Sequence, residues 1–171
     1  MEKLYSGNIF AGHYNFLLLD GNLDPDDWPI DWNLENCKIG YIITSSGRAI
    51  AIGTVADFNS HWIEVFLSTV PPLTDECERA LVFNVNITSG ELVLRASIYE
   101  KARLSISAGD YIVYILAYNL GLESEEELSD EELERRIDLE RYKIVLVPGK
   151  TNNEGVIKGS KYLPDCVFDE E

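Results

Sequence analysis

Oxygen-bearing side chains at alternate positions are the first candidates for chemistry in this sequence of 171 residues. Asp20, Asn22 and Asp24 match the first half of a calcium-binding loop, in which every second residue supplies a ligand. The sixth position of that motif is Pro25 instead of glycine, and the twelfth is Asp31 instead of glutamate. We therefore expect a solvated acidic loop without a metal, and an irregular calcium site in this loop is the alternative.

Groups for nucleophilic catalysis are sparse. His13 and His61 are the two histidines, and neither accompanies a Gly-x-Ser-x-Gly motif or a phosphate-binding glycine loop. Cys37, Cys77 and Cys166 are separated by 40 and 89 residues, which fits no zinc or redox motif, so we expect free thiols. The sequence therefore predicts a protein that is not an enzyme, with no catalytic residues and no cofactor.

Two tryptophans in the acidic loop favour binding. Trp28 and Trp32 lie in the sequence Asp-Asp-Trp-Pro-Ile-Asp-Trp. Tryptophan is enriched at interface hot spots, and neighbouring carboxylates steer a basic partner toward them. In the alternative interpretation, one or both rings pack against the protein as anchors of the loop. The predicted partner-binding residues are Asp24, Asp26, Asp27, Trp28, Asp31 and Trp32.

Alternating apolar residues predict β-strands over most of the chain. Residues 79–87 and 91–98 form one pair of alternating runs, residues 39–44 and 48–56 form another, and a glycine-containing turn joins each pair. Short strands with regular turns predict a mainly β fold, an antiparallel sandwich of the immunoglobulin-like or jelly-roll-like type with about eight or nine strands. Gly109-Asp110-Tyr111 resembles a tyrosine corner, with a plain turn as the alternative.

One helix is expected in this β protein. Ser129 and Glu132 have the spacing of a capping box, which predicts an acidic helix near 129–140. Leu133 and Ile137 lie on one face of that helix and are expected to dock it.

The length predicts a single domain. We place the domain at residues 1–148, with an acidic insert at 121–141, and expect 149–171 to be a partly disordered acidic tail. The sequence has no apolar run of about 18 residues that could span a membrane and no secretory signal, so we expect a cytoplasmic protein. The oligomeric state is left open.

The net charge of −16 is unevenly distributed. The acidic segment 123–140 carries −8, the loop from Asp20 to Glu35 carries −6, and the last seven residues hold four acids. The remaining framework is nearly neutral. A surface this acidic disfavours nucleic acid and anionic membranes, because binding to either requires cationic side chains. We expect a basic protein partner, or a cation.

The order of several short motifs resembles the competence protein J (ComJ) family over about residues 8–119. The motifs are Gly12-His13-Tyr14-Asn15-Phe16, Asp31-Trp32, Gly40-Tyr41, Ala49-Ile50-Ala51-Ile52, Arg103-Leu104-Ser105-Ile106 and Gly109-Asp110-Tyr111. The acidic segment 123–140 and the tail look like additions to the family pattern.

The resemblance implies an acidic protein that binds a DNA-entry nuclease and inhibits it. An acidic inhibitor would compete for the basic cleft of such a nuclease through electrostatic and aromatic contacts. The alternative function is a calcium- or small-ligand-binding β-sandwich module.

Overall fold

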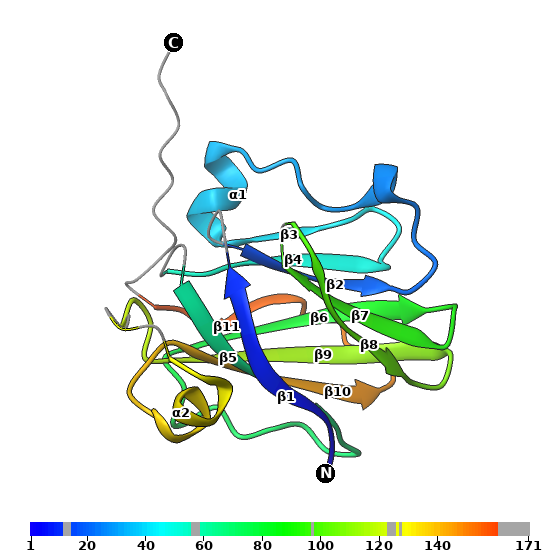
Figure 1. The fold of residues 1–171 in the computed structure, drawn as a ribbon. Helices are drawn as coiled ribbons and strands as arrows, with labels where there is room; N and C mark the ends of the chain where they lie inside the picture. The colour runs from blue at the N-terminus through cyan, green and yellow to red at the C-terminus, as the bar shows by residue number, and fades with distance from the viewer. Residues whose placement is uncertain (12–14, 56–58, 97, 123–125, 127, 161–171) are drawn as a thin grey trace.

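The computed structural model describes the chain except for residues 12–14, 56–58, 97, 123–125, 127 and 161–171. Within the described residues, eleven strands form two sheets that pack face to face (Figure 1). None of the described helices is long and apolar enough to cross a membrane.

The first sheet has six strands in the order β1-β5-β10-β9-β6-β11. Strand β5 pairs with β10 in parallel, and the other neighbours in this sheet are antiparallel. The strands are β1 (Glu2–Ala11), β5 (Asn59–Leu67), β6 (Arg79–Ile87), β9 (Gly109–Tyr118), β10 (Arg141–Pro148) and β11 (Gly155–Lys158).

The second sheet has five strands in the order β3-β4-β2-β7-β8, all antiparallel to their neighbours. Two short helices, α1 (Leu34–Ile39) and α2 (Asp130–Arg135), lie outside the sheets (Figure 1). The strands are β2 (Asn15–Asp20), β3 (Tyr41–Ile43), β4 (Ala49–Gly53), β7 (Glu91–Ala96) and β8 (Glu100–Ser105).

The prediction of a mainly β fold is confirmed, but the sheets are not wholly antiparallel, and there are more strands than expected. The part of the chain that precedes the acidic loop supplies two strands, β1 and β2, which belong to different sheets. The expected tail supplies β11, which pairs with β6. Apolar residues at every second position predict a strand, but they do not show where the chain passes from one sheet to the other.

The predicted alternation of apolar and polar residues places apolar side chains in the core between the two sheets. Phe83, Val85 and Ile87 of β6 are buried there, as are Leu92 and Leu94 of β7. Because successive side chains of a strand point to opposite faces, this spacing places all of them on the inner faces.

One local prediction near the connections is confirmed, and another is wrong. The Tyr111 hydroxyl donates a hydrogen bond of 2.6 Å to the Ser107 carbonyl, as a tyrosine corner requires. The prediction that the alternating run 91–98 continues as far as Ile98 is wrong, because β7 ends at Ala96 and Ile98 is exposed.

Helix α2 starts at the predicted capping box but ends earlier than expected. The Ser129 side chain and Glu132 cap each other's main chain, and the helix stops at Arg135. Leu133 is buried, as predicted, whereas Ile137 lies past the helix end and is exposed. Leu133 packs against Trp62 and Leu139 on the outer face of the six-stranded sheet.

Candidate functional site

The acidic loop between β2 and α1 carries all six predicted partner-binding residues. Asp24 caps a 3-10 helix over Pro25–Asp27 by accepting a hydrogen bond of 2.9 Å from the Asp26 N–H. Four carboxylates of the loop are exposed, and none of them forms a salt bridge within the described residues. They are Asp24, Asp26, Asp27 and Asp31. The loop therefore presents uncompensated negative charge to solvent.

Trp28 and Trp32 hold this loop on the outer face of the five-stranded sheet. Both are half-buried and pack against a cluster that includes Leu17, Leu19 and Val93. The Arg95 guanidinium lies 4.5 Å from the centre of the Trp28 ring, a cation–π distance. The Nε1 atoms of both indoles are shielded from solvent. The rings therefore serve as anchors of the loop, the alternative considered for them from the sequence.

The loop and the β3–β4 turn enclose a groove of about 270 Å³. The groove contains four of the six predicted residues, whereas Asp24 and Trp32 lie outside it. Its lining combines apolar side chains with three carboxylates and three hydroxyls. The lining residues are Asp26, Asp27, Trp28, Pro29, Asp31, Ile42, Thr44, Ser45 and Ser46.

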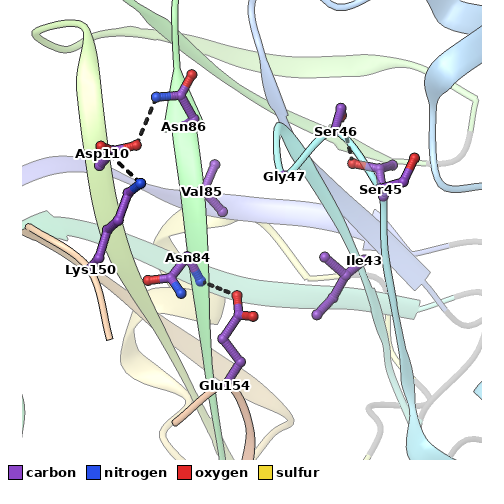
Figure 2. Close-up of a pocket in the computed structure, with 11 residues that line it drawn as sticks. Ile43, Ser45, Ser46, Gly47, Asn84, Val85, Asn86, Asp110, Lys150 and Glu154 are labelled. Carbon is purple, nitrogen blue, oxygen red and sulfur yellow. Dashed lines mark hydrogen bonds and ion pairs between the residues drawn. The ribbon is translucent and has the colours of Figure 1, made fainter. Parts of the chain in front are cut away.

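A second pocket, of about 340 Å³, lies on the other side of the same turn (Figure 2). Within it, the Asn84 N–H donates 2.7 Å to Glu154 Oε1, and Asn86 Nδ2 donates 2.8 Å to Asp110 Oδ1. Lys150 Nζ lies 3.6 Å from Asp110 Oδ2. These polar groups bind one another, as the dashed lines of Figure 2 show, so we assign no chemistry to this pocket.

Sequence reasoning missed the second pocket. Its walls come from the turn at 44–47, from β6, from the start of β9 and from the segment after β10. No spacing within one segment signals their convergence. Gly47 at the turn, with φ of +68°, is the single local signal that a tight hairpin end forms here.

Asp20 belongs to the framework rather than to a cation site. Its carboxylate is 1% exposed and accepts five hydrogen bonds, from the N–H and hydroxyl of Thr88, the N–H and hydroxyl of Ser89, and Arg48 Nε. Burial alone would raise the pKa of Asp20, but the hydrogen bonds from Ser89, Thr88 and Arg48 hold it well below its usual range. A calcium ion here would have to displace the Arg48 guanidinium. Among the described residues, no group of three His, Cys, Asp or Glu side chains is arranged to hold a metal.

The structure brings one histidine beside an acid, inside the core. His61 Nε2 lies 3.5 Å from Glu140 Oε2, and the two side chains are 0% and 1% exposed. Glu140 also accepts hydrogen bonds from the Val55 N–H, the Gly121 N–H and the Tyr142 hydroxyl. Burial would raise the pKa of Glu140, but His61, the Tyr142 hydroxyl and the Val55 N–H lower it. Because the pair is out of solvent, it fastens the ends of the acidic insert to the core and presents no acid–base group to a substrate.

The remaining candidates for chemistry are the three cysteines and His13. Cys77 is a buried free thiol, but Cys37 takes part in a disulfide bond, so the expectation of a free thiol is wrong at Cys37. Cys166 and His13 lie outside the described residues.

The two acidic segments lie on opposite sides of the molecule. The loop covers the outer face of the five-stranded sheet, whereas α2 packs on the outer face of the six-stranded sheet (Figure 1). One flat partner surface therefore cannot contact both of them. The fold and the site together define a two-sheet β protein with an acidic loop anchored on one face.

Residues 13–140 match the family model of Competence protein J (ComJ). Because the match covers most of the chain, this protein belongs to the competence protein J family. The acidic segment 123–140 lies within the matched range, whereas residues 149–171 lie beyond it. No curated protein sequence matches the chain.

Two solved structures share the fold. The first is ComJ from Bacillus subtilis, described as the inhibitor of the DNA degrading activity of NucA, with a TM-score of 0.64 and 17% identity over 86% of this chain and 98% of that one. The second is the protein described as Crocagin biosynthetic gene J, with a TM-score of 0.52 and 16% identity over 88% of this chain and 100% of that one. At these identities the likeness concerns the fold.

Proposed function

We propose that this protein is an inhibitor of a DNA-degrading nuclease and that its acidic loop contacts the basic cleft of that enzyme. The observation that carries the proposal is the loop itself, in which exposed carboxylates border a groove on a segment fixed by two tryptophans. Membership of the competence protein J family supports it, since the Bacillus subtilis relative inhibits the nuclease NucA.

The proposed mechanism is competition for the surface that binds DNA. A nuclease cleft that holds phosphates is rich in cations, and the carboxylates of Asp26, Asp27 and Asp31 carry the charge that such a cleft attracts. Trp28 and Trp32 keep the carboxylates in place, so little conformational entropy is lost on binding. The inhibitor performs no chemistry in this mechanism.

The experiment measures DNA degradation by a purified non-specific nuclease from the same organism, with and without this protein. Inhibition and a complex are expected at about 50 mM salt, and both should weaken as salt screens the charges. Absence of both inhibition and complex at low salt would refute the proposal.

Charge reversal then locates the contact. The D26K/D27K double variant should slow association about 10-fold or more at low salt, with a smaller change in dissociation, because peripheral charges act mainly on the encounter. The matched control is E131K/E134K, which changes the net charge equally but alters exposed acids of α2 on the other side of the molecule. Equal slowing by the two variants would assign the effect to net charge and not to the loop.

A further inference from the structure

Ile30 is an apolar side chain at the centre of the acidic loop, and it points away from the protein core. It lies midway in sequence between Trp28 and Trp32, whose rings pack on the sheet, yet 58% of its own surface is exposed. A single exposed isoleucine is common on protein surfaces and needs no explanation by itself. The residues around Ile30 distinguish it from other exposed isoleucines.

Main-chain hydrogen bonds fix the segment that carries Ile30. The Trp28 N–H donates to the Pro25 carbonyl at 3.2 Å, and the Ile30 N–H donates to the Trp28 carbonyl at 2.9 Å. The Trp32 N–H donates in turn to the Ile30 carbonyl at 3.0 Å. Pro29, which precedes Ile30, has a ring that fixes its own backbone angle. The side chain is therefore held ready for contact, which lowers the entropy cost of burying it against a partner.

Exposed carboxylates flank this apolar side chain along the chain. Asp31 follows it directly, and Asp27 precedes it by three residues, on the other side of Trp28 and Pro29. Interfaces are built in this way, with an apolar centre that becomes fully buried and a charged rim that stays near water. The negative rim specifies a partner surface that is basic.

We propose that Ile30 is the apolar anchor of the nuclease contact and fills an apolar depression within the basic surface of the partner. This inference rests on the proposed function and extends it by giving the carboxylates and Ile30 different roles in binding. The carboxylates determine how fast the complex forms, and Ile30 determines how slowly it dissociates.

The test compares dissociation rates from the immobilised nuclease that the wild-type protein inhibits. I30S should dissociate about 10-fold faster or more, with an association rate within about twofold of wild type. I30L, which keeps the apolar volume, should restore slow dissociation. The matched control is L73S, because Leu73 is 85% exposed on the connection between β5 and β6. Thermal unfolding of each variant should stay close to the wild-type temperature, because more than half of the surface of each side chain is exposed.

The outcomes separate the inference from the proposed function. If wild type binds and D26K/D27K slows association, but I30S dissociates at the wild-type rate, the anchor is refuted and the inhibitor function stands. Equal acceleration by I30S and L73S also refutes the anchor. If wild type neither binds nor inhibits the nuclease, both proposals fail.

Discussion

Replacing Asp20 with asparagine should destabilise the protein more than any comparable change among the exposed acids of the same loop. The Asp20 carboxylate connects the end of β2 to Arg48, ahead of β4, and to Thr88 and Ser89 in the β6–β7 turn. An amide removes the negative charge and presents its own N–H groups to donors, so at least one buried donor loses its acceptor.

The structure sets the size of this effect. Removing one partner of a buried ion pair costs about 3–5 kcal/mol. Arg48 Nη2 lies 2.8 Å from Asp20 Oδ2, but the Arg48 side chain is 26% exposed, so water can solvate part of its charge after the substitution. We therefore expect D20N to lower the free energy of unfolding by about 3 kcal/mol, at the lower end of that range.

The assay is denaturant-induced unfolding at neutral pH, with D24N as the matched control. Asp24 is exposed, and its carboxylate accepts one hydrogen bond from the described residues, that of the Asp26 N–H at the start of the 3-10 helix. Asparagine caps a helix about as well as aspartate, so D24N should change the free energy of unfolding by less than about 0.5 kcal/mol. Equal destabilisation by D20N and D24N would refute the role given to Asp20.

The pH dependence provides a second check on the same reasoning. The pKa of Asp20 is lowered in the folded state, so the unfolded chain binds the proton more readily. The contribution of the carboxylate is therefore fully present above its ordinary pKa of about 4 and is lost as the pH falls toward the folded-state pKa. The difference in stability between wild type and D20N should shrink below about pH 4. A difference that stays constant down to about pH 3 would contradict the assigned hydrogen bonds.

Two further predictions concern the framework. L133A should lower the free energy of unfolding by about 2–3 kcal/mol, because Leu133 is 3% exposed, whereas I137A, at a residue 76% exposed, should change it by less than about 0.5 kcal/mol. Equal effects in denaturant unfolding would show that α2 is not docked through Leu133. Y111F should cost about 1 kcal/mol in the same measurement, since it removes the hydrogen bond to the Ser107 carbonyl, and a neutral result would show that this bond does not stabilise the fold.

Local pattern predicted the parts of the fold that depend on neighbours in sequence. The inward residues of β6, the capping box at Ser129 and the Tyr111 corner each follow from a spacing of a few residues. The 3.5 Å approach of His61 to Glu140 joins residues far apart in the chain, and no local pattern records it. The parallel pairing of β5 with β10 escaped prediction for the same reason.

The candidate site was predictable in composition but not in orientation. Acids and tryptophans together indicated a binding loop, yet the sequence left open whether the rings face a partner or the protein. One signal would have decided this. Phe16, Leu17, Leu18 and Leu19 form a strand that is apolar on both faces, so something must cover its outer face. The indoles of Trp28 and Trp32 provide that cover.

The walls of the pocket in Figure 2 also bear on aggregation. Strand β11 pairs with β6 over Ala80–Val82, and among the described residues no strand pairs with the rest of that edge. The Asn84 N–H there donates to the Glu154 carboxylate, and the Asn86 N–H donates 2.9 Å to the Gly47 carbonyl. Open edges recruit strands from other molecules, and occupied donors cannot take part in that pairing. Glu154 and the β3–β4 turn thus protect this edge against edge-to-edge pairing with strands of other molecules. They do so without covering the acidic loop.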